Sequence, residues 1–172
     1  YAAGRTCGLE REAIVSSLAS FRGLAHRQEL LAVIDGISYV NDSKATNGES
    51  AARALSCYSN IYWIAGGRAK DGGMEAASPY LDRVRHVYLI GEAAIDLAQN
   101  LESEIPVTVS GELSSAVDQA RANALADSGD GAVVLLSPAC ASLDQFDNFE
   151  TRGEAFRELV DALPGKRMEA VT

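Results

Sequence analysis

The sequence predicts an α/β fold, a Rossmann-like three-layer sandwich on a mostly parallel sheet of about six strands with one antiparallel edge strand. From residue 37 onward short apolar strands alternate with helical segments, an order typical of parallel sheets joined by right-handed crossovers. Asp35-Gly36 stands between two alternating apolar segments and predicts a tight hairpin, which adds the antiparallel strand. The 172 residues suit one good-sized domain with a piece of a second.

The individual elements follow from hydrophobic spacing. After a helix end and a turn at Gly8, we expect helices at 9–18, 48–56, 75–84, 93–101, 112–126 and 151–163. We expect strands at 29–34, 37–40, 61–65, 87–90, 107–109 and 132–136. Thr46–Glu49 and Thr151–Glu154 match the capping-box pattern, and therefore predict the starts of the helices near 48 and 151.

Composition excludes several classes of protein. An apolar fraction of 47% and a charged fraction of 23% are ordinary for a globular chain, and no apolar run reaches membrane-spanning length. The net charge of -9 argues against nucleic-acid partners and anionic membranes. The three cysteines show neither zinc-site nor disulfide spacing, so we expect reduced thiols, no metal site and a cytoplasmic protein. We also expect a monomer.

Polar chemistry collects in three strand-to-helix loops, which in a parallel sheet share the ligand-binding rim at the carboxyl ends of the strands. Loop 41–47 combines a carboxylate, an ammonium, amides and hydroxyls at the start of a helix. Loop 66–73 carries four glycines with Arg68 and Lys70, and loop 137–149 carries small residues with two hydroxyls. Cations, hydroxyls and helix N-termini suit a small dicarboxylate or a phosphate better than a neutral ligand. Loop 41–47 taken alone is about equally consistent with a polar loop that caps a helix, and a glycine-rich loop taken alone is more often a flexible connector.

Other catalytic motifs are missing from the sequence. It contains neither the dinucleotide-binding glycine fingerprint nor a P-loop, and no serine or cysteine stands in a nucleophile context with a histidine. His26-Arg27, in the connector before the first strand, places an arginine where it can meet a phosphate, although a solvated arginine is the commoner outcome.

Three longer segments resemble a known family. They are residues 41–47 (Asn-Asp-Ser-Lys-Ala-Thr-Asn), 65–70 (Ala-Gly-Gly-Arg-Ala-Lys) and 135–153, which ends in Phe-Asp-Asn-Phe-Glu-Thr-Arg-Gly. Together they resemble the C-terminal domain of the Mur ligases, in the branch that adds D-glutamate during peptidoglycan precursor synthesis. Residues 23–27 resemble that family's passage into the domain, with Ala25 where proline is usual. The resemblance implies that residues 1–23 are the tail of a central ATPase domain and that 24–172 form the C-terminal, amino-acid-binding domain.

The resemblance also implies an ATP-dependent amide ligation. ATP phosphorylates the alanyl carboxylate of UDP-N-acetylmuramoyl-L-alanine, and the amine of D-glutamate attacks the resulting acyl phosphate. The P-loop and the Mg²⁺ ligands of the family lie in the part of the enzyme that this chain lacks, so we expect the chain alone to be inactive.

Site residues follow from the same resemblance. Lys44 is the implied catalytic residue, stabilising the charge of the phosphorylated intermediate. Arg27, Asp42 and Lys44 are the implied nucleotide contacts. The residues implied to hold D-glutamate are Thr46, Lys70, Ser142, Leu143 and Phe149, the last through its backbone.

Three other functions compete with this one. A folylpolyglutamate-type ligase would keep the chemistry and change the substrate, but the 42–47 and 137–153 motifs argue against it. A stand-alone anion-binding module is the alternative from another class of protein. A nicotinamide oxidoreductase is remote, because the glycine fingerprint is missing.

Overall fold

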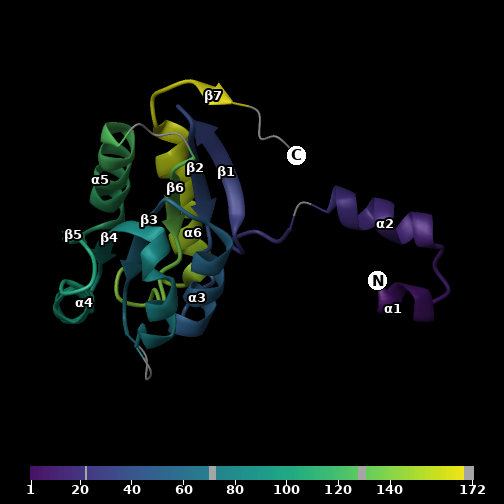
Figure 1. Cartoon of the computed structure of the whole chain (residues 1–172), viewed down its shortest axis with the longest axis horizontal. Helices are drawn as coiled ribbons and strands as arrows, with labels where there is room; N and C mark the ends of the chain where they lie inside the picture. Colours follow the sequence, from purple (N-terminus) through teal and green to yellow (C-terminus); the bar gives the residue numbers. More distant parts are fainter. Residues whose placement is uncertain (22, 70–72, 128–130, 169–172) are drawn as a thin grey trace.

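The computed structural model describes residues 1–21, 23–69, 73–127 and 131–168 (Figure 1). Its strands are β1 (Glu29–Ile34), β2 (Ile37–Asn41), β3 (Ile61–Gly66), β4 (Val84–Ile90), β5 (Val107–Gly111), β6 (Val133–Leu136) and β7 (Arg167–Met168). Its helices are α1 (Ala2–Thr6), α2 (Arg11–Ser20), α3 (Gly48–Cys57), the 3₁₀ helix η1 (Glu75–Arg83), α4 (Ala94–Leu101), α5 (Leu113–Ala126) and α6 (Phe149–Ala162).

One sheet organises the fold, with its described strands in the order β5-β4-β3-β6-β2-β1-β7. The strands from β5 to β2 pair in parallel, and β1 pairs antiparallel with both β2 and β7. The predicted α/β class is therefore confirmed. The mostly parallel sheet with an antiparallel edge, predicted with about six strands, is confirmed as well; the described part holds seven strands, because the two-residue β7 lies outside β1. A strand of two exposed residues has no hydrophobic period to reveal it.

Helices cover both faces of the sheet (Figure 1). Helices α3, η1 and α4 pack on one face, where Trp63 and Leu135 are buried. Helices α5 and α6 pack on the other, where Tyr62 and Val134 are buried. Successive residues of a strand point to opposite faces, so a strand covered on both sides must be apolar throughout, as β3 and β6 are.

The predicted hairpin between β1 and β2 is confirmed. Asp35 and Gly36 have φ angles of 52° and 83°, the left-handed pair that a two-residue type I′ turn requires. The Asp35 carboxylate also accepts a bond from the Lys166 backbone N–H (2.8 Å) and forms an ion pair with Arg121 (2.8 Å). The turn thereby anchors the segment that leads into β7.

Both predicted capping boxes were wrong. Asn47 caps α3 by accepting a bond from the Ser50 N–H (2.8 Å), and Asn148 caps α6 by accepting one from the Thr151 N–H (2.7 Å). Asparagine is at least as good an N-cap as threonine; Asn47 stands one residue after Thr46, and Asn148 stands three residues before Thr151. Helix α6 therefore begins at Phe149 rather than 151, which brings its first turn up to the ligand rim. The other bounds differ from prediction by up to three residues, as is usual for helix and strand ends.

Helices α1 and α2 extend away from the layers of the sheet (Figure 1). Ile14 is their buried residue, whereas Val15 and Leu18, predicted to share an apolar face with it, are 52% and 60% exposed. Among the described residues, none of the helices combines the length and the apolar character needed to cross a bilayer.

Candidate functional site

Hydrogen bonds join the loops that follow the three central strands β2, β6 and β3. The Ser137 hydroxyl donates to Oδ2 of Asp42 (2.7 Å), which links the loop after β6 to the loop after β2. Arg68 and Ala141 exchange two backbone bonds of 2.9 Å, which links the loops after β3 and β6. The structure therefore brings the three predicted loops together at one rim. The cause is the strand order, which places β6 between β3 and β2.

A pocket of about 340 Å³ opens beside the first of these loops. We call it the cationic pocket, because three of its lining residues are Arg27, Lys44 and Arg53. The remaining lining residues are Gln28, Asp42, Ala45 and Ser50. All three residues predicted to approach a nucleotide thus line one concave surface. Three cations around a single carboxylate favour an anionic ligand with several charges, such as a polyphosphate.

Asp42 forms the buried wall of the cationic pocket. Its carboxylate accepts bonds from the Ser137 hydroxyl (2.7 Å) and the Gln28 backbone N–H (3.2 Å), and the residue is only 7% exposed. Burial outweighs these bonds and the attraction of Arg27, and raises the pKa of Asp42 to about 6. The carboxylate is ionised at neutral pH, but burying its negative charge costs folding free energy. A cation that accompanies a ligand would stabilise this charge.

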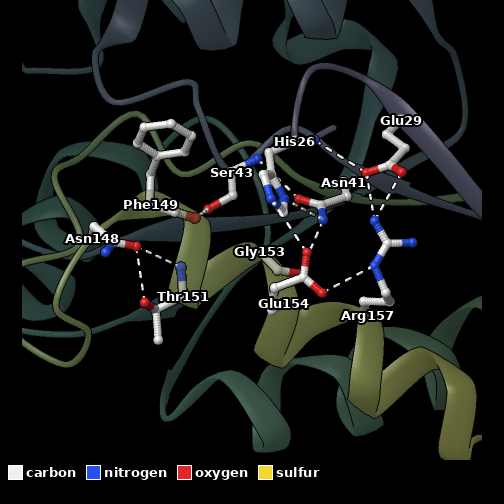
Figure 2. A network of polar contacts seen from close by, with 10 residues as sticks. All are labelled: His26, Glu29, Asn41, Ser43, Asn148, Phe149, Thr151, Gly153, Glu154 and Arg157. Atoms are coloured by element: carbon white, nitrogen blue, oxygen red, sulfur yellow. Dashed lines mark hydrogen bonds and ion pairs between the residues drawn. The ribbon is translucent and has the colours of Figure 1, made fainter. Parts of the chain in front are cut away.

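Lys44 is held at both its backbone and its ammonium group. Its N–H donates to the His26 carbonyl (3.1 Å), and Nζ lies 3.8 Å from the centroid of the Phe149 ring. The carbonyl of Phe149 accepts a bond from the Ser43 hydroxyl (2.8 Å), which joins the first turn of α6 to the first loop (Figure 2). A cation over an aromatic face is attracted to the ring's quadrupole, so Phe149 restrains the ammonium beside the pocket.

A polar network fixes the connector that carries Arg27 (Figure 2). His26 is buried, with Nδ1 3.2 Å from the Asn41 amide nitrogen and Nε2 3.4 Å from Glu154. Because the Asn41 amide donates to Nδ1, the ring proton of a neutral His26 lies on Nε2, facing Glu154. Arg157 of α6 holds Glu29 with two bonds of 2.8 and 2.9 Å.

Close packing leaves little room for other side chains in this network. The Asn41 amide also donates to the Gly153 carbonyl (3.0 Å), and a Cβ on Gly153 would collide with the His26 ring. His26 and Gln28 have φ angles of 61° and 47°, a backbone strain that fixed surroundings must hold. The connector thus meets the domain in one defined geometry, with Arg27 directed to the pocket.

The residues predicted to hold D-glutamate lie in different environments. Ser142 is buried, Thr46 and Phe149 are half-buried, and Leu143 is 58% exposed. Leu143 lines a separate, acidic pocket of about 460 Å³, whose other lining residues are Asp144, Gln145, Phe146, Asp147 and Thr151. Lys70 lies outside the described residues. The assignment of these five residues to one amino-acid site stays a prediction.

Sequence reasoning missed several residues that the fold places at the rim. Glu92, from the loop after β4, forms an ion pair with Arg68 (3.0 Å), and no pattern in the sequence singled it out. Arg53 enters the cationic pocket from α3, where the sequence pattern gives it only an exposed helical position. Arg152 is buried beneath the loops. Its one sequence signal was a charged residue inside the 135–153 motif.

Metal ligation and thiol chemistry find little support. In the part of the chain that the structure describes, no group of three or more His, Cys, Asp or Glu residues could hold a metal ion. Burial raises the pKa of the Cys140 thiol to about 11, so the thiol stays protonated at neutral pH and is a poor nucleophile.

The fold is that of a Rossmann-like α/β domain, and three cationic side chains line a pocket at its rim. The chain belongs to the family described as "Mur ligase, glutamate ligase domain", which matches residues 26–140. It is 51% identical over 170 residues to the UDP-N-acetylmuramoylalanine--D-glutamate ligase of Rhodospirillum rubrum, covering 99% of this chain and 36% of that protein. It is 50% identical over 163 residues to the ligase of the same name from Caulobacter vibrioides, covering 95% of this chain and 34% of that protein.

The chain therefore spans about a third of the length of these relatives. Among solved structures, UDP-N-acetylmuramate-alanine ligase from Thermotoga maritima matches with a TM-score of 0.62 and 13% identity, covering 94% of this chain and 36% of that chain. At this identity the likeness supports the fold alone.

Proposed function

We propose that this chain is the C-terminal, amino-acid-binding part of an ATP-dependent ligase that joins D-glutamate to UDP-N-acetylmuramoyl-L-alanine in peptidoglycan precursor synthesis. The observation that carries the proposal is the cationic pocket, which brings Arg27, Asp42 and Lys44 together from two separate segments of the chain. The names of the relatives and the share of their length that the chain spans support the substrate and the C-terminal position.

The cationic pocket is the proposed approach of the nucleotide and of the acyl phosphate. Transfer of the γ-phosphoryl group to the alanyl carboxylate forms an acyl phosphate and ADP, and both carry negative charge. Lys44 would stabilise that charge as it develops, and the ring of Phe149 holds the ammonium close to where it is needed. Arg27 would contact the nucleotide, since the His26 network directs it to the pocket.

Attack of the D-glutamate amine then forms the amide and releases phosphate. The residues proposed to orient D-glutamate are Thr46, Lys70, Ser142, Leu143 and Phe149. Hydroxyl groups, an ammonium group and the N-terminus of a helix can donate hydrogen bonds to the two carboxylates of D-glutamate. None of these residues acts as a nucleophile, because their task is to hold the amine in line with the acyl carbon.

Mg²⁺ and the P-loop are assigned to the part of the ligase outside this chain. Asp42 is the one carboxylate among the residues lining the cationic pocket, and the described residues contain no group of three or more potential metal ligands. We further propose that residues 1–23 belong to the preceding ATPase domain. The exposed apolar side chains of Val15 and Leu18 support this division, because such a face is normally buried against a neighbour. We propose a cytoplasmic monomer.

The test is phosphate release by the full-length ligase with ATP, UDP-N-acetylmuramoyl-L-alanine and D-glutamate. We expect release to require D-glutamate, Ser142→Ala to raise its KM, and Lys44→Ala to lower kcat at least about 100-fold. Lys166→Ala is the matched control, since Lys166 is exposed beside the β1–β2 turn at the opposite end of the sheet. Activity with L-glutamate or aspartate instead of D-glutamate would refute the proposed specificity. Full activity of Lys44→Ala would remove Lys44 from the mechanism.

A further inference from the structure

Arg152 is a charged residue buried in the middle of the site. It is 1% exposed, and its guanidinium reaches from α6 into two of the ligand loops. Nε donates to the Ser43 hydroxyl oxygen (3.0 Å), while Nη2 donates to the carbonyls of Ser43 (2.9 Å) and Cys140 (3.1 Å). One planar side chain therefore connects the loop after β2 with the loop after β6.

Among the described residues, the positive charge of Arg152 has no direct counterion. No ion pair of Arg152 occurs among the described residues, and Asp144 acts on it only through space. Cys140, whose carbonyl it holds, carries a protonated thiol. Burial lowers the pKa of Arg152 to about 10, which leaves the guanidinium charged at neutral pH. Buried charges are normally paired, since an unpaired one is costly to desolvate.

The guanidinium also has an unused donor. Nη1 is buried and has no hydrogen-bond partner within the described part of the chain. It lies on the side of Gly67, where an added Cβ would come within 3.2 Å of it. Arg152 thus contacts or approaches all three loops of the rim, namely those after β2, β3 and β6.

A chain of contacts extends the influence of Arg152 to Lys44. The Ser43 hydroxyl accepts from Arg152 and donates to the Phe149 carbonyl (2.8 Å), so its orientation is determined at both ends. The ring of Phe149 in turn faces the Lys44 ammonium at 3.8 Å. The bond to the Cys140 carbonyl likewise restrains the segment leading to Ser142.

We propose that Arg152 is a positioning residue for ligation, which holds the three rim loops in their ligand-binding arrangement and places beneath them a positive charge that a dicarboxylate amino acid neutralises. The inference rests on the proposed function and deepens it, because it explains how loops rich in small residues select a doubly negative substrate. Arg152 acts through Ser43 and Cys140 and through its field, without touching the reacting atoms.

The test compares variants of the full-length ligase by steady-state kinetics. Arg152→Met removes the charge, Arg152→Lys keeps it without the planar fork, and Ser43→Ala breaks the contact chain to Phe149. Arg121→Met is the matched control: Arg121 is a largely buried arginine whose hydrogen bonds to Tyr39, Asp35 and Pro164 lie at the opposite end of the sheet. Circular dichroism and thermal unfolding show which variants are folded.

We expect Arg152→Met to raise the KM for D-glutamate at least about 10-fold, equivalent to about 1.4 kcal/mol, with the KM for ATP within about 3-fold of wild type. Arg152→Lys should fall between Arg152→Met and wild type, and Arg121→Met should match wild type in both KM values. A purely structural role would instead lower stability in Arg152→Met and leave the D-glutamate KM unchanged, which would overturn the proposal.

Two further outcomes are decisive. If Arg152→Met does not fold, the test uses Arg152→Lys and Ser43→Ala instead. A D-glutamate KM equal to that of wild type in both of these variants overturns the proposal. If the wild-type enzyme releases no phosphate in response to D-glutamate, the proposed function itself fails. That result is separate from a failure of Arg152, in which wild type is active and the variants are kinetically indistinguishable from it.

Discussion

Replacing Asp42 by asparagine should stabilise this 172-residue chain at neutral pH, even though it removes a residue of the proposed nucleotide site. Asp42 is 7% exposed, and burial raises its pKa from the ordinary 3.8 to about 6. Asparagine keeps an oxygen that can accept the Gln28 N–H and offers an amide that can donate to the Ser137 hydroxyl oxygen. The substitution therefore removes the buried charge and leaves hydrogen-bonding partners for its neighbours.

The direction and size of the effect follow from linkage between protonation and folding. Between about pH 4 and pH 6 the folded state binds a proton that the unfolded chain has released, so the contribution of Asp42 to stability decreases as pH rises through this window. A raised pKa of about two units corresponds to about 3 kcal/mol, which is the cost of the ionised carboxylate at pH 7. Asp42→Asn should recover up to about this amount, or a melting temperature several degrees higher.

Urea unfolding at pH 4, 5, 6 and 7.5 measures the effect. The difference in unfolding free energy between Asp42→Asn and wild type should be near zero at pH 4, grow through pH 6, and stay constant above pH 7. Asp118→Asn removes one exposed carboxylate from α5 and controls for net charge. A variant less stable than wild type at pH 7.5, or a difference independent of pH, would show that the hydrogen bonds to Asp42 outweigh its burial.

Three further predictions concern the rim. Burial raises the pKa of the Cys140 thiol to about 11, so a thiol reagent should modify the two exposed cysteines of the folded chain quickly and Cys140 only on unfolding. Rapid labelling of all three cysteines would contradict the assigned burial of Cys140. Gly67→Ala should lower the unfolding free energy by more than about 1 kcal/mol, because φ is 125° and the new Cβ would meet the Ala141 carbonyl; wild-type stability in urea would disprove this. A double-mutant cycle of Lys44→Met and Phe149→Leu, read by urea unfolding, should give a coupling of about 0.5–1 kcal/mol, and additive effects would show that the cation–π contact contributes nothing.

Local sequence patterns predicted most of the secondary structure. Asp35-Gly36 predicted the hairpin because only a few dipeptides accept the left-handed conformation at two successive residues. Both Asp35 and Gly36 adopt that conformation. The apolar runs of β3 and β6 predicted buried parallel strands, because a strand covered on both faces has no polar side. The caps of α3 and α6 were misplaced because threonine and asparagine compete for the same role within a few residues.

The sequence also predicted which loops meet at the rim, but not how their side chains pair. Arg27, Asp42 and Lys44 could be singled out by type and position, whereas the cationic pocket that joins them to Arg53 depends on how the connector packs against β2 and α6. Residue type and spacing act over a few positions of the chain, so they report loops, strands and helices. Whether an arginine such as Arg152 is solvated or buried depends on contacts with residues up to 109 positions away, and only the tertiary structure decides that.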